Sequence, residues 1–133
     1  MSEQQTDSTT YKHKGALRLW KAMLCSFSGL RYAYEEAAFR LEIIAGSGLI
    51  VLACCMQIES TERLFLIGSV LLVLIVEILN SAIEAVVDDI SLEHRSMAKR
   101  AKDMGSAAVF ITLLNVALCW GIVIYSNRAL FFA

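Results

Sequence analysis

The sequence predicts an all-α membrane protein with three transmembrane helices and an N-terminal amphipathic helix on the membrane surface. Three observations favour this fold class. The 133-residue chain is 57% hydrophobic and has a mean hydropathy of +0.59, well above a typical soluble domain. Its apolar residues gather in three long runs, with no proline to break a helix. Its basic residues lie mostly on one side of those runs, which is typical of membrane proteins.

The N-terminal region divides into a polar tail and an amphipathic helix. Residues 1–11 are polar and lack apolar periodicity, so we expect a disordered tail before a single domain over 12–133. Over 12–29, apolar residues share one helical face beside basic ones, which is typical of a helix lying in the membrane interface. These apolar residues are Leu17, Trp20, Met23, Leu24 and Phe27. We expect the helix to end or bend near Gly29, because Arg31 would otherwise fall on the apolar face.

The three predicted spans run over about 36–56, 64–87 and 105–125. A span needs about 20 residues, which the second and third runs provide easily. The first run has a clean apolar core only over 43–56, so Arg40 and Glu42 must sit at its boundary or face the bundle. We interpret Glu42 as a buried structural partner. Small residues at 45–48 allow another helix to approach closely, and we expect the charged connection 88–103 to be at least partly helical.

The distribution of lysine and arginine sets the orientation. Six of the twelve basic residues precede the core of the first span, and four lie between the second and third spans. Only Arg63 and Arg128 fall on the other side. Because positive charge marks the cytoplasmic side, we expect a cytoplasmic N-terminus and a C-terminus outside.

A stripe of polar residues runs along the second span, in V-E-I-L-N-S-A-I-E-A-V-V-D at 76–88. At about 100° per residue, these side chains fall within one arc of a helix. They are Glu77, Asn80, Ser81, Glu84 and Asp88. A polar seam that joins helices by hydrogen bonds would explain the amide and the hydroxyl. Carboxylates inside a membrane are costly and face a bundle interior, an aqueous cavity or a metal, so the stripe is the candidate site.

The polar stripe and the nearby basic residues together suit phosphoryl transfer. The stripe, the basic residues and the surface helix converge at the cytoplasmic boundary, where a lipid headgroup meets a water-soluble nucleotide. Mg²⁺ is usually held by one or two carboxylates plus phosphates, and Glu36 and Glu84 are candidates. Lys102 and Arg18 could meet phosphates, and Glu77, deeper in the span, suits general-base work. A soluble kinase fold is excluded because neither a P-loop nor a glycine-rich kinase loop is present.

Simpler interpretations of the same residues remain open at this point. Glu36 and Arg40 are spaced as an i, i+4 ion pair at a helix end. Lys99 and Arg100 suit a topology signal or contacts with anionic lipid, and Arg18 suits a headgroup anchor as well as a nucleotide contact.

Three blocks carry a family resemblance: E-A-A-F-R at 36–40, the stripe sequence at 76–88 and A-K-D-M-G-S-A-A-V at 101–109. A looser match is R-x-x-K-A-x-x-x-S-x-x-G-L-R at 18–31. With these blocks the chain resembles the bacterial integral-membrane diacylglycerol kinase family. The resemblance implies a homotrimer in the inner membrane that transfers the γ-phosphoryl group of MgATP to 1,2-diacylglycerol. The product is phosphatidic acid, made in phospholipid recycling, and no nucleic acid takes part.

The resemblance also implies a role for particular residues. Glu77 would be the catalytic base with Asn80 supporting it, and Glu36 and Glu84 would bind Mg²⁺. The implied ATP-binding residues are Arg18, Glu36, Glu84, Glu93, His94, Arg95, Lys102 and Asp103. The implied lipid-binding residues are Arg40, Glu77 and Ser106. The chain departs from the family pattern by one missing residue between Gly29 and Glu36, by Glu35 in place of an amide and by Cys25 in place of a tyrosine.

Two alternative functions follow from the same features. A kinase of this fold could act on undecaprenol, although the block E-A-A-F-R favours diacylglycerol. A small ion-coupled or proton-coupled transporter would also carry glutamates within a span. Such a transporter would show pH-driven flux without using ATP.

Overall fold

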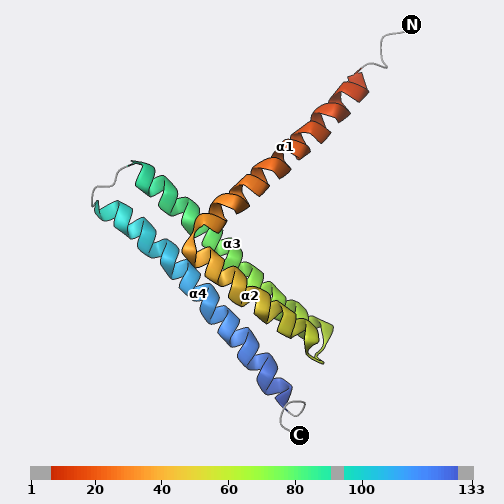
Figure 1. Ribbon diagram of the computed structural model, residues 1–133, viewed down its shortest axis with the longest axis vertical. Helices are drawn as coiled ribbons and strands as arrows, with labels where there is room; N and C mark the ends of the chain where they lie inside the picture. Colours follow the sequence, from red (N-terminus) through yellow and green to blue (C-terminus); the bar gives the residue numbers. More distant parts are fainter. Residues whose placement is uncertain (1–6, 91–94, 129–133) are drawn as a thin grey trace. The chain divides into compact units, whose positions relative to one another are not determined.

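The computed structural model describes residues 7–90 and 95–128, and within these ranges the regular structure is entirely α-helical (Figure 1). The helices are α1 (Asp7–Glu35), α2 (Ala37–Cys55), α3 (Ser60–Ile90) and α4 (Ser96–Ser126). The chain divides into two compact units, Met1–Glu35 and Glu36–Ala133, which are described separately. Helices α2, α3 and α4 are each long and apolar enough to cross a membrane, which confirms the predicted fold class.

Helix α1 is longer at both ends than the predicted 12–29. It begins at Asp7, inside the predicted tail, and continues through Gly29 to Glu35. Gly29 does not adopt positive φ, and no proline interrupts the chain, so nothing in the backbone ends the helix there. The predicted disorder of residues 1–6 lies outside the described residues. Large apolar side chains on this helix are exposed, among them Leu17, Leu19, Trp20, Met23, Leu24, Phe27 and Leu30.

Helix α3 is central in the three-helix unit and packs against both α2 and α4. Short connections make α2 antiparallel to α3 and α3 antiparallel to α4 (Figure 1). Within the charged connection, residues 88–90 and 96–103 are helical, as predicted, because α3 continues to Ile90 and α4 begins at Ser96 rather than near residue 105. No glycine or proline lies between Ser96 and Gly105, so the helix can extend beyond the apolar span.

Close packing of α2 on α3 depends on a glycine. A Cβ placed on Gly46 would lie 2.8 Å from Cγ1 of Val70, well inside van der Waals contact. The prediction that the small residues allow close approach is therefore correct at this position.

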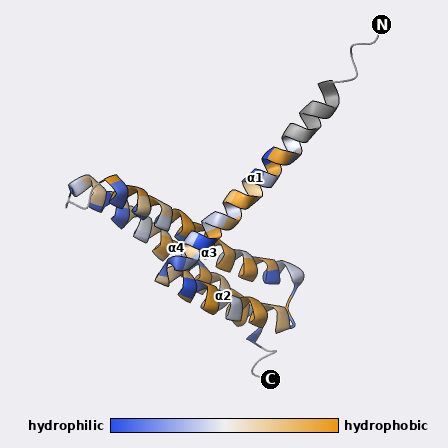
Figure 2. Cartoon of the chain, turned by 45° about the horizontal axis from the view of Figure 1, so that its top comes forward, coloured by the Kyte–Doolittle hydropathy of each residue, from blue (hydrophilic) through white to orange (hydrophobic). Residues whose placement is uncertain are grey.

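The apolar core lies toward the α2–α3 connection. It consists of Ala53, Met56, Leu66, Trp120 and Val123. Most other large apolar side chains of the unit are exposed, as expected for helices that face lipid or a neighbouring chain. In Figure 2, apolar residues follow the middle of the helices, while hydrophilic residues gather toward the α3–α4 connection. The polar and apolar parts of the unit are thus segregated along its length.

Polar contacts fix the end of the unit at the α2–α3 connection. Nε and Nη2 of Arg63 donate to main-chain carbonyls at the end of α2, at 3.1, 3.0 and 3.5 Å. These carbonyls belong to Ala53, Met56 and Ile58. Nearby, Nδ2 of Asn127 donates to Oε1 of Glu62 at 3.0 Å and joins the end of α4 to the start of α3. Because the last carbonyls of a helix lack helical partners, Arg63 satisfies groups that would otherwise need water.

Candidate active site

The acidic stripe on α3 is buried at its Glu77 end and becomes more exposed toward the α3–α4 connection. Glu77 and Asn80 lie one turn apart on the same face and are 5% and 9% exposed. Glu84 is half-buried one turn further on, and Asp88 is exposed. This gradient agrees with the predicted arc. It also means that a group reaching Glu77 from water passes Asp88 and Glu84 first.

Asn80 connects the stripe to helix α4. Its Nδ2 donates to Oε1 of Glu84 at 3.4 Å. Its Oδ1 is buried without a hydrogen-bond partner among the described residues and lies against Gly105 of α4. The resemblance implied support for Glu77, whereas this hydrogen bond is made to Glu84. In this structure Asn80 therefore holds Glu84, the carboxylate that we predict to bind the metal.

The start of α2 brings a further carboxylate to the stripe. Glu36 is the N-cap of α2, with an extended backbone at φ −75° and ψ 132°, and its side chain makes no capping hydrogen bond. Glu36 and Glu84 both lie close enough to Glu77 to interact with it electrostatically. Arg40 is half-buried one turn into α2, and its backbone N–H donates to the Glu36 carbonyl at 3.2 Å. The structure thus brings three predicted site glutamates together within one unit.

The basic residues of α4 meet the stripe at its open end. Nζ of Lys102 lies 2.7 Å from Oδ1 of Asp88 on α3. Lys102 also interacts electrostatically with Glu84. Asp103, predicted to bind ATP, pairs with Lys99 one turn earlier on the exposed side of α4. Lys102 is therefore positioned beside the carboxylates, and its pairing with Asp88, a predicted member of the stripe, is a contact that the sequence alone did not identify.

For the remaining predicted site residues, the structure shows no hydrogen bond or ion pair with the stripe or does not describe the residue. Arg95 is the exposed N-cap of α4, and Ser106 is exposed on the same helix. Glu93 and His94 lie outside the described residues. Arg18 is exposed on α1, in the other unit, so its part in ATP binding stays a prediction.

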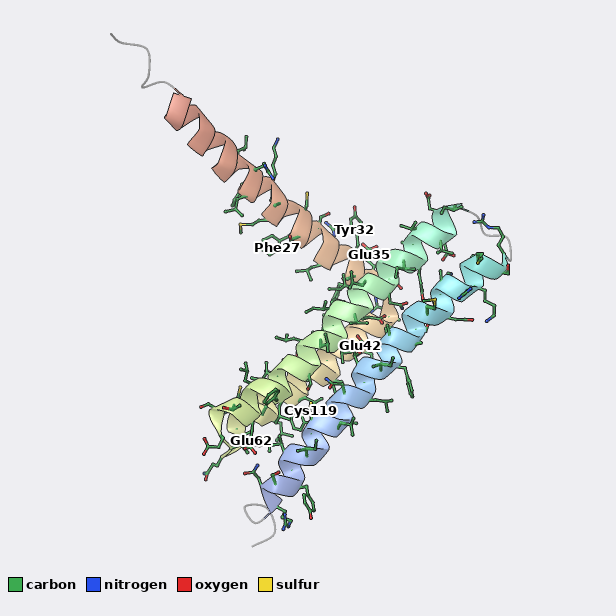
Figure 3. All side chains as sticks on the ribbon, turned by 180° about the vertical axis from the view of Figure 1, so that it is seen from behind. Phe27, Tyr32, Glu35, Glu42, Glu62 and Cys119 are labelled. Atoms are coloured by element: carbon green, nitrogen blue, oxygen red, sulfur yellow. The ribbon has the colours of Figure 1, made fainter. Side chains whose placement is uncertain are left out.

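Glu42 is more closely connected to the site than the sequence suggested. Glu42 lies on α2 (Figure 3) and is half-buried. It interacts electrostatically with Glu77. The sequence predicts that Glu42 is a buried structural partner, and its Oε2 is indeed buried but has no hydrogen-bond partner in the described part of the chain. It lines an apolar cavity of about 90 Å³ between α2, α3 and α4, together with residues such as Gly46, Val73 and Leu113. The only sequence feature that points to a link between Glu42 and the site is the position of this glutamate within an apolar run.

The carboxylates suit a cation that arrives with phosphates rather than one held by the protein alone. Among the described residues, no three Asp, Glu, His or Cys side chains form a group that could hold a metal ion. Mg²⁺ usually takes one or two carboxylates and completes its shell with phosphates and water. Glu36 and Glu84 offer that donor set, and Nδ2 of the buried Asn80 holds Glu84 by a hydrogen bond. These residues therefore fit Mg²⁺ bound together with a nucleotide.

Comparison with known proteins agrees with this chemistry. The family model for prokaryotic diacylglycerol kinase matches residues 24–124, which include α2, α3 and most of α4. A diacylglycerol kinase of Escherichia coli K12 is 49% identical over 114 residues, covering 85% of this chain and 93% of that protein. The diacylglycerol kinase of Pseudomonas aeruginosa is 42% identical over 111 residues, covering 83% and 90%. That of Haemophilus influenzae is 41% identical over 116 residues, covering 86% and 98%. This multi-pass membrane protein therefore belongs to the prokaryotic diacylglycerol kinase family.

Proposed function

We propose that this chain transfers the γ-phosphoryl group of ATP to 1,2-diacylglycerol, giving phosphatidic acid for phospholipid recycling. The observation that carries the proposal is the gathering of Glu36, Glu77 and Glu84 on one side of an apolar helical unit. Relatives at 41–49% identity are named for this activity. A buried carboxylate that leads outward to exposed acidic and basic groups suits a reaction between an alcohol from the bilayer and a nucleotide from water.

Glu77 is the general base in this proposal. Its carboxylate takes the proton of the lipid hydroxyl while the hydroxyl oxygen forms a bond to the γ-phosphorus. The bond from that phosphorus to the bridging oxygen breaks, and its electron pair leaves with ADP. The burial of Glu77 keeps bulk water away from the attacking position, which favours transfer to the lipid over hydrolysis.

The surrounding groups hold the phosphates in line. Glu36 and Glu84 would hold Mg²⁺, which would neutralise charge on the phosphate oxygens. Lys102 adds a positive charge from α4, and Asn80 orients Glu84. Further contacts to ATP are assigned to Arg18, Glu93, His94, Arg95 and Asp103, and contacts to the lipid to Arg40 and Ser106.

The working enzyme in this proposal is a homotrimer in the bacterial inner membrane, with its N-terminus in the cytoplasm. Three helices do not enclose two large substrates, and α3 exposes large apolar side chains to lipid or a neighbouring chain on the face turned away from the stripe. These include Leu79, Ile83 and Val86. We expect a neighbouring protomer to complete the site, so that each site is shared between subunits.

A lipid-choice assay tests the function. Wild type and Glu77→Gln are offered radiolabelled ATP and Mg²⁺ in mixed micelles that contain either diacylglycerol or undecaprenol. We expect labelled phosphatidic acid from wild type and at least about a hundredfold lower kcat for Glu77→Gln, the usual contribution of a general base. If only undecaprenol were labelled, the substrate would be a polyprenol and the diacylglycerol assignment would be wrong.

Glu59→Gln is a matched control, because Glu59 is exposed at the far end of the unit, next to the start of α3. This variant should retain wild-type turnover. Size-exclusion chromatography in detergent should show both variants assembled like wild type. Normal turnover by an assembled Glu77→Gln protein would contradict the role of Glu77 as base.

A further inference from the structure

Gly105 on α4 lies directly against the amide of Asn80 on α3. A Cβ placed on Gly105 would overlap Oδ1 of Asn80 and would lie 3.3 Å from its Cγ and 3.9 Å from its Cα. The space that any other side chain would need at this position is already filled by Asn80. The glycine is therefore what allows α4 to pack over the stripe at this level.

Glycine is needed at position 105 because it has no side chain, not because its backbone is more flexible. Gly105 does not adopt positive φ, so its backbone is accessible to any residue. A Cβ placed on Gly68 of α3 or on Gly121 of α4 would have nothing within 4 Å in the chain. Gly105 thus differs from other glycines of the same two helices in the contact that it makes.

The position of Oδ1 decides where the other end of the amide points. Asn80 is buried, its Oδ1 lies against Gly105, and its Nδ2 donates to Oε1 of Glu84. The amide group is planar, so pushing Oδ1 away from α4 also turns Nδ2 away from its present direction. At 3.4 Å the hydrogen bond to Glu84 is already long and has little tolerance for such a movement.

We propose that Gly105 is a positioning residue of the phosphoryl-transfer site. It leaves room for the one orientation of Asn80 that holds Glu84 in place for the metal–nucleotide complex. The inference rests on the proposed function, because it takes Glu84 as a ligand of that complex. Gly105 itself touches neither substrate, and it acts through Asn80.

The test compares Gly105→Ala with Gly121→Ala in the full-length protein in detergent. Binding of Mn²⁺ is measured by electron paramagnetic resonance with a non-hydrolysable ATP analogue and no lipid, alongside KM for Mg²⁺ and kcat. We expect Gly105→Ala to weaken Mn²⁺ binding and raise KM for Mg²⁺ by about tenfold, as for loss of a hydrogen bond to a charged group. The kcat at saturating Mg²⁺ should change far less, and Gly121→Ala should match wild type. Unchanged Mn²⁺ affinity in Gly105→Ala would overturn the inference.

A second pair of variants separates positioning from folding. If Gly105 acts through Asn80, adding Gly105→Ala to Asn80→Ala should leave Mn²⁺ affinity where Asn80→Ala alone places it. If Gly105→Ala fails to fold, the double variant should recover assembly, because the overlapping amide is gone. Further loss of affinity, or a double variant that also fails to fold, would overturn the inference.

Failure of the inference about Gly105 can be distinguished from failure of the proposed function. Mn²⁺ binding is measured without lipid, so a wild type that binds Mn²⁺ with nucleotide but does not label diacylglycerol would contradict only the substrate assignment. A wild type that binds no Mn²⁺ would overturn the role of Gly105 directly.

Discussion

Lys102 on α4 donates to the carboxylate of Asp88 on α3, with Nζ at 2.7 Å from Oδ1 and 2.9 Å from Oδ2. Both side chains are partly exposed, at 36% and 49%, so the ion pair is screened by water and weak. A weak pair holds the ammonium group toward the acidic stripe but lets it change partner at little cost. Lys102 can therefore leave Asp88 for a nucleotide phosphate.

Asp88→Asn should strengthen ATP binding. The substitution removes the anion that competes with phosphate for Lys102 and also lowers the negative charge that a nucleotide approaches. We expect KM for ATP to fall about two- to fivefold, the range that corresponds to an exposed ion pair. Steady-state kinetics at fixed free Mg²⁺ would measure it, with Asp89→Asn as the exposed neighbouring control. A rise in KM would show instead that Asp88 serves to position Lys102.

Glu42→Gln should stabilise the folded protein. Oε2 of Glu42 is buried without a partner in the described part of the chain, and Glu77 lies within electrostatic range. Removing the charge while keeping the shape relieves desolvation and repulsion, by about 1 kcal/mol or more. Thermal unfolding in detergent should give a higher Tm.

The same substitution at Glu62 is the control for Glu42→Gln. Glu62 accepts hydrogen bonds from Nδ2 of Asn127 at 3.0 and 3.2 Å, so Glu62→Gln should lower Tm. Equal shifts of Tm in the two variants would contradict the distinction between a paired and an unpaired carboxylate.

Gly46→Val should separate α2 from α3. Its Cβ would lie 2.8 Å from Cγ1 of Val70, and overpacking of this kind costs about 1–3 kcal/mol. Unfolding by a denaturing detergent should therefore occur at lower concentration than in wild type. Gly48→Val is the control, because a Cβ on Gly48 has nothing within 4 Å in the chain. Combining Gly46→Val with Val70→Ala should recover much of the loss, and no recovery would argue against the steric explanation.

The sequence was sufficient to predict features that depend on neighbouring residues of one helix. Apolar runs of adequate length identified the three spans, and the helical period placed Glu77, Asn80 and Glu84 on one face. Helix ends were predicted less well. With no proline, and with Gly29 in an ordinary helical backbone, the sequence has no strong stop signal to mark where α1 ends.

Contacts between helices could not be predicted in the same way. The pairing of Lys102 with Asp88 and the packing of Gly105 on Asn80 both depend on how α4 is rotated and shifted against α3. A periodic pattern fixes a face but not the register of that face against another helix. For the same reason, the sequence predicts a buried structural role for Glu42 but does not predict that its Oε2 has no hydrogen-bond partner among the described residues.

Arg63 is one of the two basic residues on the predicted outer side, and its guanidinium is engaged with carbonyls of the main chain. Arg128 likewise donates to the Tyr125 carbonyl, at 2.9 Å. A lysine at 63 would preserve the sign of the charge but not the planar fork that reaches several acceptors at once. Removing this outer positive charge to reinforce the predicted orientation would also loosen the first hairpin, so at this turn orientation and folding are not independent variables for an engineer.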